Sequence, residues 1–195
     1  ITSVRATPVS MPRPQSFTSS LGVQRASENA VVEIDTDAGI SGLGEASSIW
    51  DRRGRGEADD INGALADLLV GRDPLRANEL AALMNQRLHR AWPAKAGVEM
   101  ALLDLAGKAY GAPVHDLLGG RVRDRVLLSR SLSMGTTEEV VDQARRLTAE
   151  GYRTLKLKVG RDPAADRRHL EALRGGFPDL TLRVDANMGW SSPKE

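Results

Sequence analysis

The sequence predicts two successive domains, an α+β domain over residues 1–123 and a domain of alternating β-strands and α-helices over residues 124–195. Two observations lead to this fold class. Strand-like segments occupy the first 47 residues and helix-like segments follow them, an order typical of an α+β unit. From about residue 124, strands and helices alternate. The apolar strands of such repeated βα units form a parallel sheet, either an open doubly wound sheet or part of a (β/α)₈ barrel.

The first domain opens with a predicted antiparallel meander. Residues 1–9, 30–36 and 40–46 are typical of β-strands, and a turn sequence at residues 37–39 joins the last two. Between the first two strands, residues 13–27 are rich in Pro, Ser and Gly, which predicts a long loop. Loops of this length are uncommon in compact domains and often act as lids. We therefore expect this loop to be mobile without ligand and to close over the site with it.

Residues 58–119 predict three helices, because apolar residues recur there at spacings of three and four. Gly111 and Pro113 end the third helix. The apolar stripes consist of Ile61, Leu65, Leu68 and Leu69, then Leu80, Leu83, Met84 and Leu88, then Val98, Ala101, Leu102, Leu105 and Ala109.

The second domain contains three predicted strands, at residues 126–135, 154–160 and 182–190. Thr136, with a glutamate three residues later, offers a capping box that starts a helix after the first strand. Asp162, followed by a proline, offers an N-cap that starts a helix after the second strand. These signals fix the order of two βα units and a third strand.

Polar residues share one face of the second and third of these strands. Successive side chains of a strand point to opposite faces, so Lys156 and Lys158 face the same way. Asp185 and Asn187 also share a face, with Val184 and Ala186 on the opposite one. Two ammonium groups, a carboxylate and an amide would thus meet in one space, a candidate site for removing a proton from a carbon beside a metal-bound carboxylate. Alternatively, the lysines lie on the solvent face of an edge strand.

Three segments together resemble one known family. The segment AKAGVEMALLDLAGKAYGAPVHDLLGG, the K-x-K of TLKLKVG and the D-x-N of RVDANMGW are similar, in this order and spacing, to the mandelate racemase and muconate lactonizing enzyme branch of the enolase superfamily. The resemblance implies a capping α+β domain over residues 1–123, followed by a TIM-like (β/α)₈ barrel. It also implies Mg²⁺ bound to a substrate carboxylate and formation of an enolate, with Lys158 as the base and Asp185 as the first metal ligand.

The residue types suit that chemistry. An enolate beside a carboxylate needs a divalent cation and positive neighbours to stabilise its charge. Asp185 offers a hard oxygen ligand of the kind that Mg²⁺ prefers. Lys156 and the metal add positive charge near Lys158, which disfavours its protonated form and makes it available as a base. Asn187 would orient a ligand or a lysine by hydrogen bonding.

A complete (β/α)₈ barrel takes about 250 residues, whereas residues 124–195 hold only three predicted strands. We therefore expect a chain truncated after the third barrel strand. The family's remaining metal carboxylates and opposing acid or base would lie on later strands. Substrate specificity would depend on the loop at residues 13–27, on the segment near Trp50 and on strand ends beyond this chain.

Two classes of function remain open from the sequence. The first is a Mg²⁺-dependent enzyme, a racemase or epimerase, a cycloisomerase or, as an alternative, an acid-sugar dehydratase. The second is a non-catalytic fragment or interaction domain that binds a partner chain. Carboxylates on the fourth and fifth strands of the complete protein would favour the enzyme.

The composition excludes several other classes. With 41% hydrophobic and 27% charged residues, the chain has the composition of a globular protein. A net charge of +1 with scattered basic residues gives no basic patch for nucleic acid or a membrane surface. The absence of cysteine excludes disulfides and thiol nucleophiles, and no run of about 18 apolar residues predicts a membrane span. We expect a cytoplasmic homo-oligomer acting on a small-molecule carboxylate.

Overall fold

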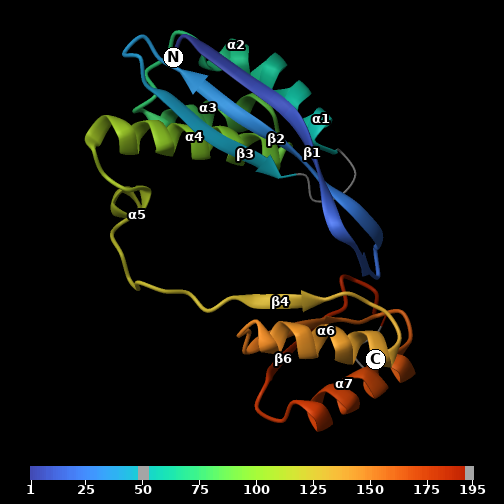
Figure 1. The fold of residues 1–195 in the computed structure, drawn as a ribbon. Helices are drawn as coiled ribbons and strands as arrows, with labels where there is room; N and C mark the ends of the chain where they lie inside the picture. Colours follow the sequence, from blue (N-terminus) through green and yellow to red (C-terminus); the bar gives the residue numbers. More distant parts are fainter. Residues whose placement is uncertain (48–52, 192–195) are drawn as a thin grey trace. The chain divides into compact units, whose positions relative to one another are not determined.

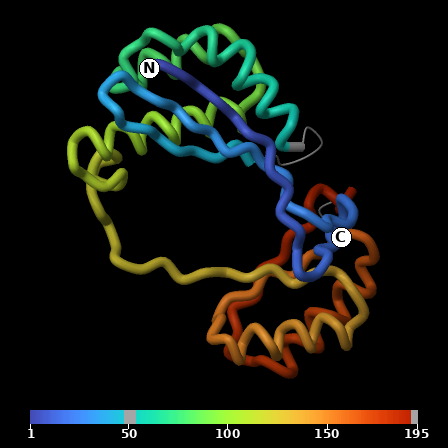
Figure 2. Tube along the Cα trace, turned by 45° about the horizontal axis from the view of Figure 1, so that its top comes forward, coloured from blue at the N-terminus to red at the C-terminus, as the bar shows by residue number. Residues whose placement is uncertain are grey.

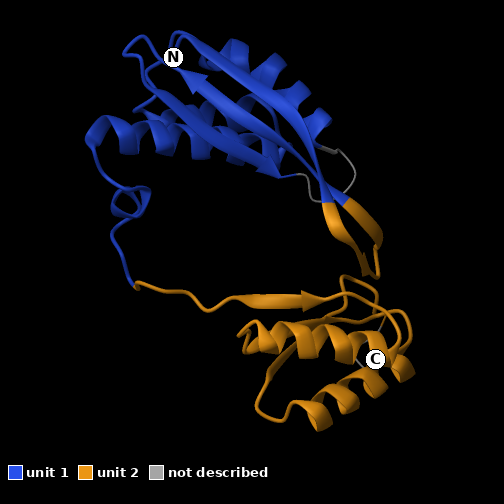
Figure 3. Ribbon diagram, viewed as in Figure 1, with its two compact units in different colours: residues 1–12, 26–122 blue, residues 13–25, 123–195 orange. Residues whose placement is uncertain are grey.

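The computed structural model describes residues 1–47 and 53–191, which form two compact units. Unit 1 comprises residues 1–12 and 26–122, and unit 2 comprises residues 13–25 and 123–195 (Figure 3). The elements are, in chain order, β1 (Ser3–Ser19), β2 (Gly22–Asp35), β3 (Ser41–Ser47), α1 (Arg53–Asp60), the π-helical turn η1 (Ile61–Leu65), α2 (Ala66–Leu69), α3 (Ala77–Arg87), α4 (Trp92–Tyr110), α5 (Val114–Leu117), β4 (Ser129–Leu132), α6 (Thr137–Ala149), β5 (Thr154–Lys158), α7 (Pro163–Gly176) and β6 (Thr181–Asp185) (Figure 1).

The first three strands form the predicted meander, in the order β1-β2-β3. β2 and β3 are antiparallel and in register, with Val32 opposite Gly44. The turn between them lies where the sequence predicts it, and Gly39 has a φ of 72°, a left-handed conformation that glycine adopts without a steric cost. The antiparallel arrangement is therefore confirmed.

The prediction of a loop at residues 13–27 is wrong. β1 continues to Ser19 and β2 begins at Gly22, so most of this segment is a β-hairpin closed by a two-residue turn. Its prolines do not prevent strand formation, because β1 is an edge strand and loses no ladder hydrogen bond on its outer side. Whether the hairpin moves on ligand binding stays a prediction.

The core of unit 1 lies between one face of this sheet and the helices, as Figure 1 shows. α4 packs directly on β3, and glycines allow the close approach: a Cβ atom on Gly44 would lie 2.0 Å from the carbonyl oxygen of Gly97 in α4. The helical region is confirmed, although the π-helical turn η1 interrupts its first helix. The largest fully buried side chains of this core are Ile34, Ile61, Leu65, Leu69, Leu80, Met84, Leu102 and Leu105.

Unit 2 contains the predicted parallel sheet, in the order β4-β5-β6. α6 and α7 cover one face of it, and the core between them consists of Leu132, Val140, Ala144, Leu147, Leu155, Leu157, Val159, Leu173 and Leu180. The capping box at Thr136 and the side-chain cap at Asp162 are both present. The first strand is shorter than predicted, because residues 126–128 lie outside it with their side chains exposed.

The third strand also ends earlier than predicted, at Asp185. Asn187 and Met188 have φ values of 46° and 63°, which a strand cannot accommodate and which asparagine tolerates better than most residues. Val184, which the sequence places on the face opposite Asp185, is 45% exposed. Val184 lies in β6, which is an edge strand of the described sheet, so neighbouring strands cover it on one side only. Within the described residues, no helix is both long and apolar enough to cross a membrane.

Candidate active site

Lys156 and Lys158 converge on one carboxylate oxygen. The Nζ atom of Lys156 lies 3.0 Å from Oδ2 of Asp185, and that of Lys158 lies 2.8 Å from the same oxygen. The geometry follows from the sheet register, which sets Lys158 level with Asp185 on the neighbouring parallel strand. The alternating residues Leu155 and Leu157 are buried in the core behind them. The prediction that the lysines share one face with Asp185 is confirmed.

Asn187 joins this cluster from the turn after β6. Its Oδ1 atom accepts a hydrogen bond from Lys158 at 2.5 Å, and its backbone N–H donates to Oδ1 of Asp185 at 3.0 Å. The side chain reaches Lys158 because the chain turns after Asp185, and not because Asn187 continues a strand. All four residues selected from the sequence are therefore brought together, one of them by a different backbone path.

Burial distinguishes the two lysines. The Lys158 side chain is 9% exposed, whereas those of Lys156 and Asp185 are each 29% exposed. The hydrogen bond from Lys158, and after it the one from Lys156, hold the pKa of Asp185 well below its usual value. Two ammonium groups around one ionised carboxylate leave a local charge of about +1. The cluster can therefore attract an anion, and Lys158 is its most enclosed member.

The tip of the β1–β2 hairpin, residues 17–20, lies at the same strand ends in unit 2. The ring of Phe17 is centred 5.9 Å from Nζ of Lys158. The N–H of Thr18 donates to Oγ of Ser133 at 2.9 Å, and the N–H of Met134 donates to the Thr18 carbonyl at 3.1 Å. Figure 2 shows this blue tip beside the segments that follow the strands. The sequence predicts a loop at residues 13–27 that closes over the site, but it does not predict the hairpin or these contacts. Phe17, an aromatic residue within a polar segment, was the one available signal for them.

A hollow of about 590 Å³ lies beside the tip, between the hairpin, β4 and α6. Phe17, Ser131 and Gln143 are among its lining residues. Ser133 also lines it, although its hydroxyl already accepts the hydrogen bond from the hairpin. The two serines of β4, Ser129 and Ser131, line this space as well. Trp50, which the sequence places near a specificity segment, lies outside the described residues.

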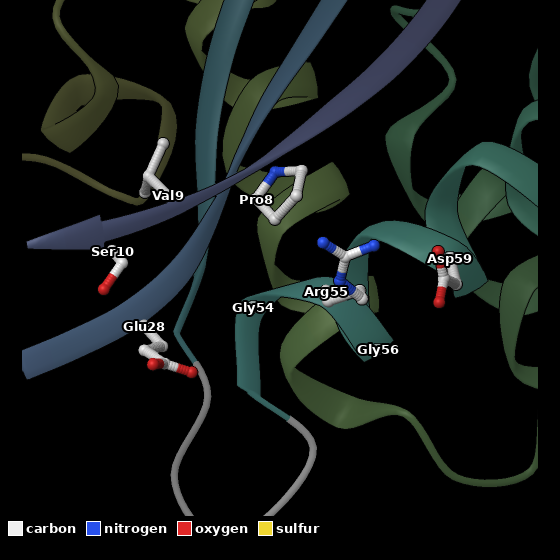
Figure 4. A pocket seen from close by; sticks show the side chains of 8 residues that line it. All are labelled: Pro8, Val9, Ser10, Glu28, Gly54, Arg55, Gly56 and Asp59. Carbon is white, nitrogen blue, oxygen red and sulfur yellow. The ribbon is translucent and has the colours of Figure 1, made fainter.

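Unit 1 has a hollow of its own, of about 630 Å³ (Figure 4). Arg55 extends along it between the β1 backbone near Pro8 and the first helix, and Glu28 and Asp59 lie at its sides. Its charges are mixed and its lining contains none of the residues selected from the sequence. The candidate site therefore remains the lysine cluster of unit 2.

Asp185 is suited to a metal ion, but it provides only one ligand. Its carboxylate is a hard oxygen donor, which Mg²⁺ prefers, and one or two such groups commonly anchor that ion. Within residues 1–47 and 53–191, no group of three or more His, Asp or Glu side chains could enclose a metal. The described residues thus supply one carboxylate ligand that fits a Mg²⁺ site.

Comparisons with protein families match both parts of the chain. Residues 1–119 match the N-terminal domain of mandelate racemase and muconate lactonizing enzyme, and residues 139–195 match the enolase C-terminal domain-like family. The second match contains both lysines, Asp185 and Asn187. The predicted fold class, a capping domain followed by the first strands of a barrel, is thereby confirmed.

Characterised proteins resemble the chain over nearly its whole length. It is 28% identical to the N-succinyl-L-Arg/Lys racemase of Bacillus cereus over 98% of this chain and 53% of the relative, and the crystal structure of that racemase superposes with a TM-score of 0.93. It is 37% identical to the chloromuconate cycloisomerase of Cupriavidus pinatubonensis over 89% of this chain and 48% of the relative.

A third similar protein is the dipeptide epimerase of Enterococcus faecalis V583, crystallised with Mg and the dipeptide L-Leu-L-Tyr. It superposes with a TM-score of 0.92 at 28% identity, over 97% of this chain and 54% of that one. The chain spans about half the length of the curated relatives it matches.

Proposed function

This chain belongs to the mandelate racemase and muconate lactonizing enzyme family, and we propose that the complete protein removes the proton beside the carboxylate of a small-molecule substrate, assisted by Mg²⁺. The resulting enolate would be reprotonated, as in a racemase or epimerase. In a cycloisomerase it would instead expel the β-oxygen and open a lactone ring, and in the direction of ring closure the enolate would form first and then take a proton. The observation that carries this proposal is the convergence of Lys156, Lys158 and Asp185 at the ends of adjacent parallel strands.

Lys158 is the residue that we assign as the base. Its Nζ is held between Asp185 and Asn187, which leaves the amine little freedom to rotate and fixes the direction from which it meets a substrate. Its low exposure also keeps bulk water from competing for the proton. To act as the base, the Lys158 ammonium must first lose a proton, and it thereby gives up its ion pair with Asp185.

Lys156 has a different role. It is more exposed than Lys158 and does not contact Asn187 in the described residues. Its positive charge lies beside the space where a substrate carboxylate would gain negative charge, so it stabilises that charge without taking the proton. The two lysines should therefore respond differently to substitution.

Asp185 is the residue that would hold Mg²⁺, and the bound ion would supply positive charge to the carboxylate of the substrate. Two ammonium groups already surround this single carboxylate. A divalent cation there would raise the local positive charge further unless more carboxylates were present. We propose that the remainder of the complete protein supplies them.

The test is proton exchange with solvent. The complete protein is incubated in D₂O with Mg²⁺ and, in turn, N-succinyl-L-arginine, L-Leu-L-Tyr and muconate, which represent the substrate types of the relatives. We expect deuterium to enter the carbon beside the carboxylate of one of the first two, or muconate to cyclise. Lys158→Ala should lower the rate by about 10²–10⁴-fold, while Lys156→Ala should slow it less.

Lys108→Ala is the matched control, because Lys108 lies in α4 and pairs with Asp104. It should retain the wild-type rate. Exchange by Lys158→Ala at the wild-type rate would remove Lys158 as the base. Loss of a β-hydroxyl from an acid sugar would instead identify a dehydratase, and no turnover of any such carboxylate would favour the interaction domain.

A further inference from the structure

The hairpin tip, residues 17–20, is bonded to the segments that follow all three strands of unit 2. Beyond its bonds to the β4 end, the hydroxyl of Ser20 donates to the carbonyl oxygen of Ala186 at 2.8 Å, just after β6. Nη2 of Arg161 donates to the carbonyl oxygen of Ser19 at 2.7 Å, just after β5. A segment distant in sequence is thus fixed over the ends of the strands that carry the lysines.

The bond from Arg161 differs in kind from the others. Those to Ser133, Met134 and Ala186 join neutral groups, whereas a guanidinium carries a full positive charge. Charge-assisted hydrogen bonds are shorter and about twice as strong as neutral ones. The acceptor, Ser19, is only 7% exposed, so water competes weakly for its carbonyl. Among the contacts that the structure gives for the tip, this one is expected to contribute most to holding it.

The backbone that carries Arg161 is itself anchored. Gly160, directly before it, has a φ of 106°, and a Cβ atom there would lie 2.9 Å from the Ala186 carbonyl oxygen. The Gly160 N–H donates to Oδ2 of Asp166 at 2.8 Å, and Asp166 is only 7% exposed in α7. A buried carboxylate thus fixes the turn that follows the lysine strand.

We propose that Arg161 is a positioning residue that tethers the hairpin tip, with Asp166 holding the turn from which it reaches. The tether keeps the Phe17 ring over the Lys158 ammonium and limits the access of solvent to that amine. The purpose of this shielding rests on the proposed role of Lys158 as the base. The tether itself does not depend on that role and is measured without substrate.

The first measurement is amide hydrogen exchange of peptides covering residues 13–25 in the complete protein without substrate. Arg161→Ala should speed exchange at the tip by about tenfold or more, the effect expected from loss of one charged hydrogen bond. Arg161→Lys, which keeps a charged donor, should restore part of the protection. Arg167→Ala is the matched control, because Arg167 is an exposed arginine of α7 paired with Glu171, and it should leave the tip unchanged.

The second measurement is the rate at which acetic anhydride acylates Lys158, followed by peptide mass spectrometry with Lys108 as the internal reference. Arg161→Ala and Phe17→Ala should both speed acylation of Lys158 several-fold, but only Arg161→Ala should also speed exchange at the tip. A separate Lys158→Ala result that disproves the base would leave these expectations unchanged.

Two outcomes would overturn the proposal. One is a correctly folded Arg161→Ala protein, judged by circular dichroism, with wild-type exchange at the tip. The other is faster exchange at the tip with no change in Lys158 acylation, which would separate the tether from any shielding. If Arg161→Ala does not fold, Arg161→Gln, which keeps the length of the side chain, takes its place with the same expectations.

Discussion

The two sheets of this protein are each packed against helices on one face, but they differ in how their polar groups are paired. In unit 1, Asp35 accepts hydrogen bonds from the hydroxyls of Ser3 and Ser41, so a single charge is solvated by neutral donors. In unit 2, Asp185 accepts hydrogen bonds from the ammonium groups of Lys156 and Lys158. Their combined positive charge exceeds the negative charge of the carboxylate. A surplus of like charge opposes folding and is not needed for packing. The difference agrees with the proposal that the reaction takes place in unit 2.

The largest effect should come from a side chain added where α4 packs closely on β3 in unit 1. Gly44→Ala would place a Cβ atom 2.0 Å from the carbonyl oxygen of Gly97. This oxygen belongs to the backbone, and the position of a Cβ atom is fixed by the backbone, so neither atom can rotate away. We expect a loss of about 3 kcal/mol or more in the free energy of unfolding, measured by urea denaturation.

Gly63→Ala is the matched control, because a Cβ atom there meets nothing within 4 Å. This substitution should be neutral or slightly stabilising, since alanine favours helix over glycine by about 1 kcal/mol. Equal stability of the two variants would show that the approach of α4 to β3 is looser than described.

The second effect concerns the surplus charge in unit 2. In the complete protein, Asp185→Asn should abolish turnover and weaken Mg²⁺ binding by more than the roughly 10–100-fold that loss of even an outer partner of a metal ligand costs. Isothermal titration calorimetry measures this affinity. Asp179→Asn, the same change at an exposed position of unit 2, should leave it intact. Unchanged Mg²⁺ affinity in Asp185→Asn would exclude Asp185 from the site.

The smallest effect is a difference in how strongly salt changes the pKa of Asp185 and that of Asp35. The pKa of Asp35 is lowered mainly by the hydroxyls of Ser41 and Ser3, and that of Asp185 mainly by Lys158 and Lys156. Raising the ionic strength to about 1 M shortens the screening length to about 3 Å. The pKa of Asp185, followed by NMR, should then rise toward its usual 3.8 more than that of Asp35 does. Equal changes would contradict the distinction between the two sheets.

The same shifts set the pH dependence of stability. Both carboxyls have a lower pKa in the folded chain than in the unfolded one, so each stabilises the fold fully at pH values well above 3.8. This contribution is lost as the pH falls through the folded pKa. Unfolding by acid, monitored by circular dichroism, should therefore begin below pH 3.8. Added salt should raise the pH at which unit 2 begins to unfold.

Strand periodicity was sufficient to predict the central part of the site. Lys156, Lys158 and Asp185 lie within regular strands, where the alternation of faces and the parallel register are fixed by backbone geometry. The same rule also predicts that Asn187 lies beside these residues, but it assumes that the strand continues to Asn187. In fact Asn187 lies in a turn with a positive φ, which the alternation of strand faces does not predict. Val184 obeys the alternation, but its exposure depends on what covers an edge strand.

The hairpin tip could not be predicted by any local rule. A polar segment with prolines has the composition of a loop, and its strand conformation comes from pairing between β1 and β2. Its place in unit 2 depends on bonds to Ser133 and Arg161, which are 115 and 142 residues from their partners in the tip. No window of the sequence contains both ends of such a contact.

These separations set an order of events during synthesis. The tip leaves the ribosome long before Ser133, Arg161 and Ala186 do, the last of which is 166 residues from Ser20. Unit 1 has its own core and can fold first. The tip has its full set of docking partners only after Ala186, which follows β6, has emerged, and contacts of such high sequence separation form slowly. Attachment of the hairpin is thus expected to be the final step in the folding of the described chain, and the step at which the amine of Lys158 becomes enclosed.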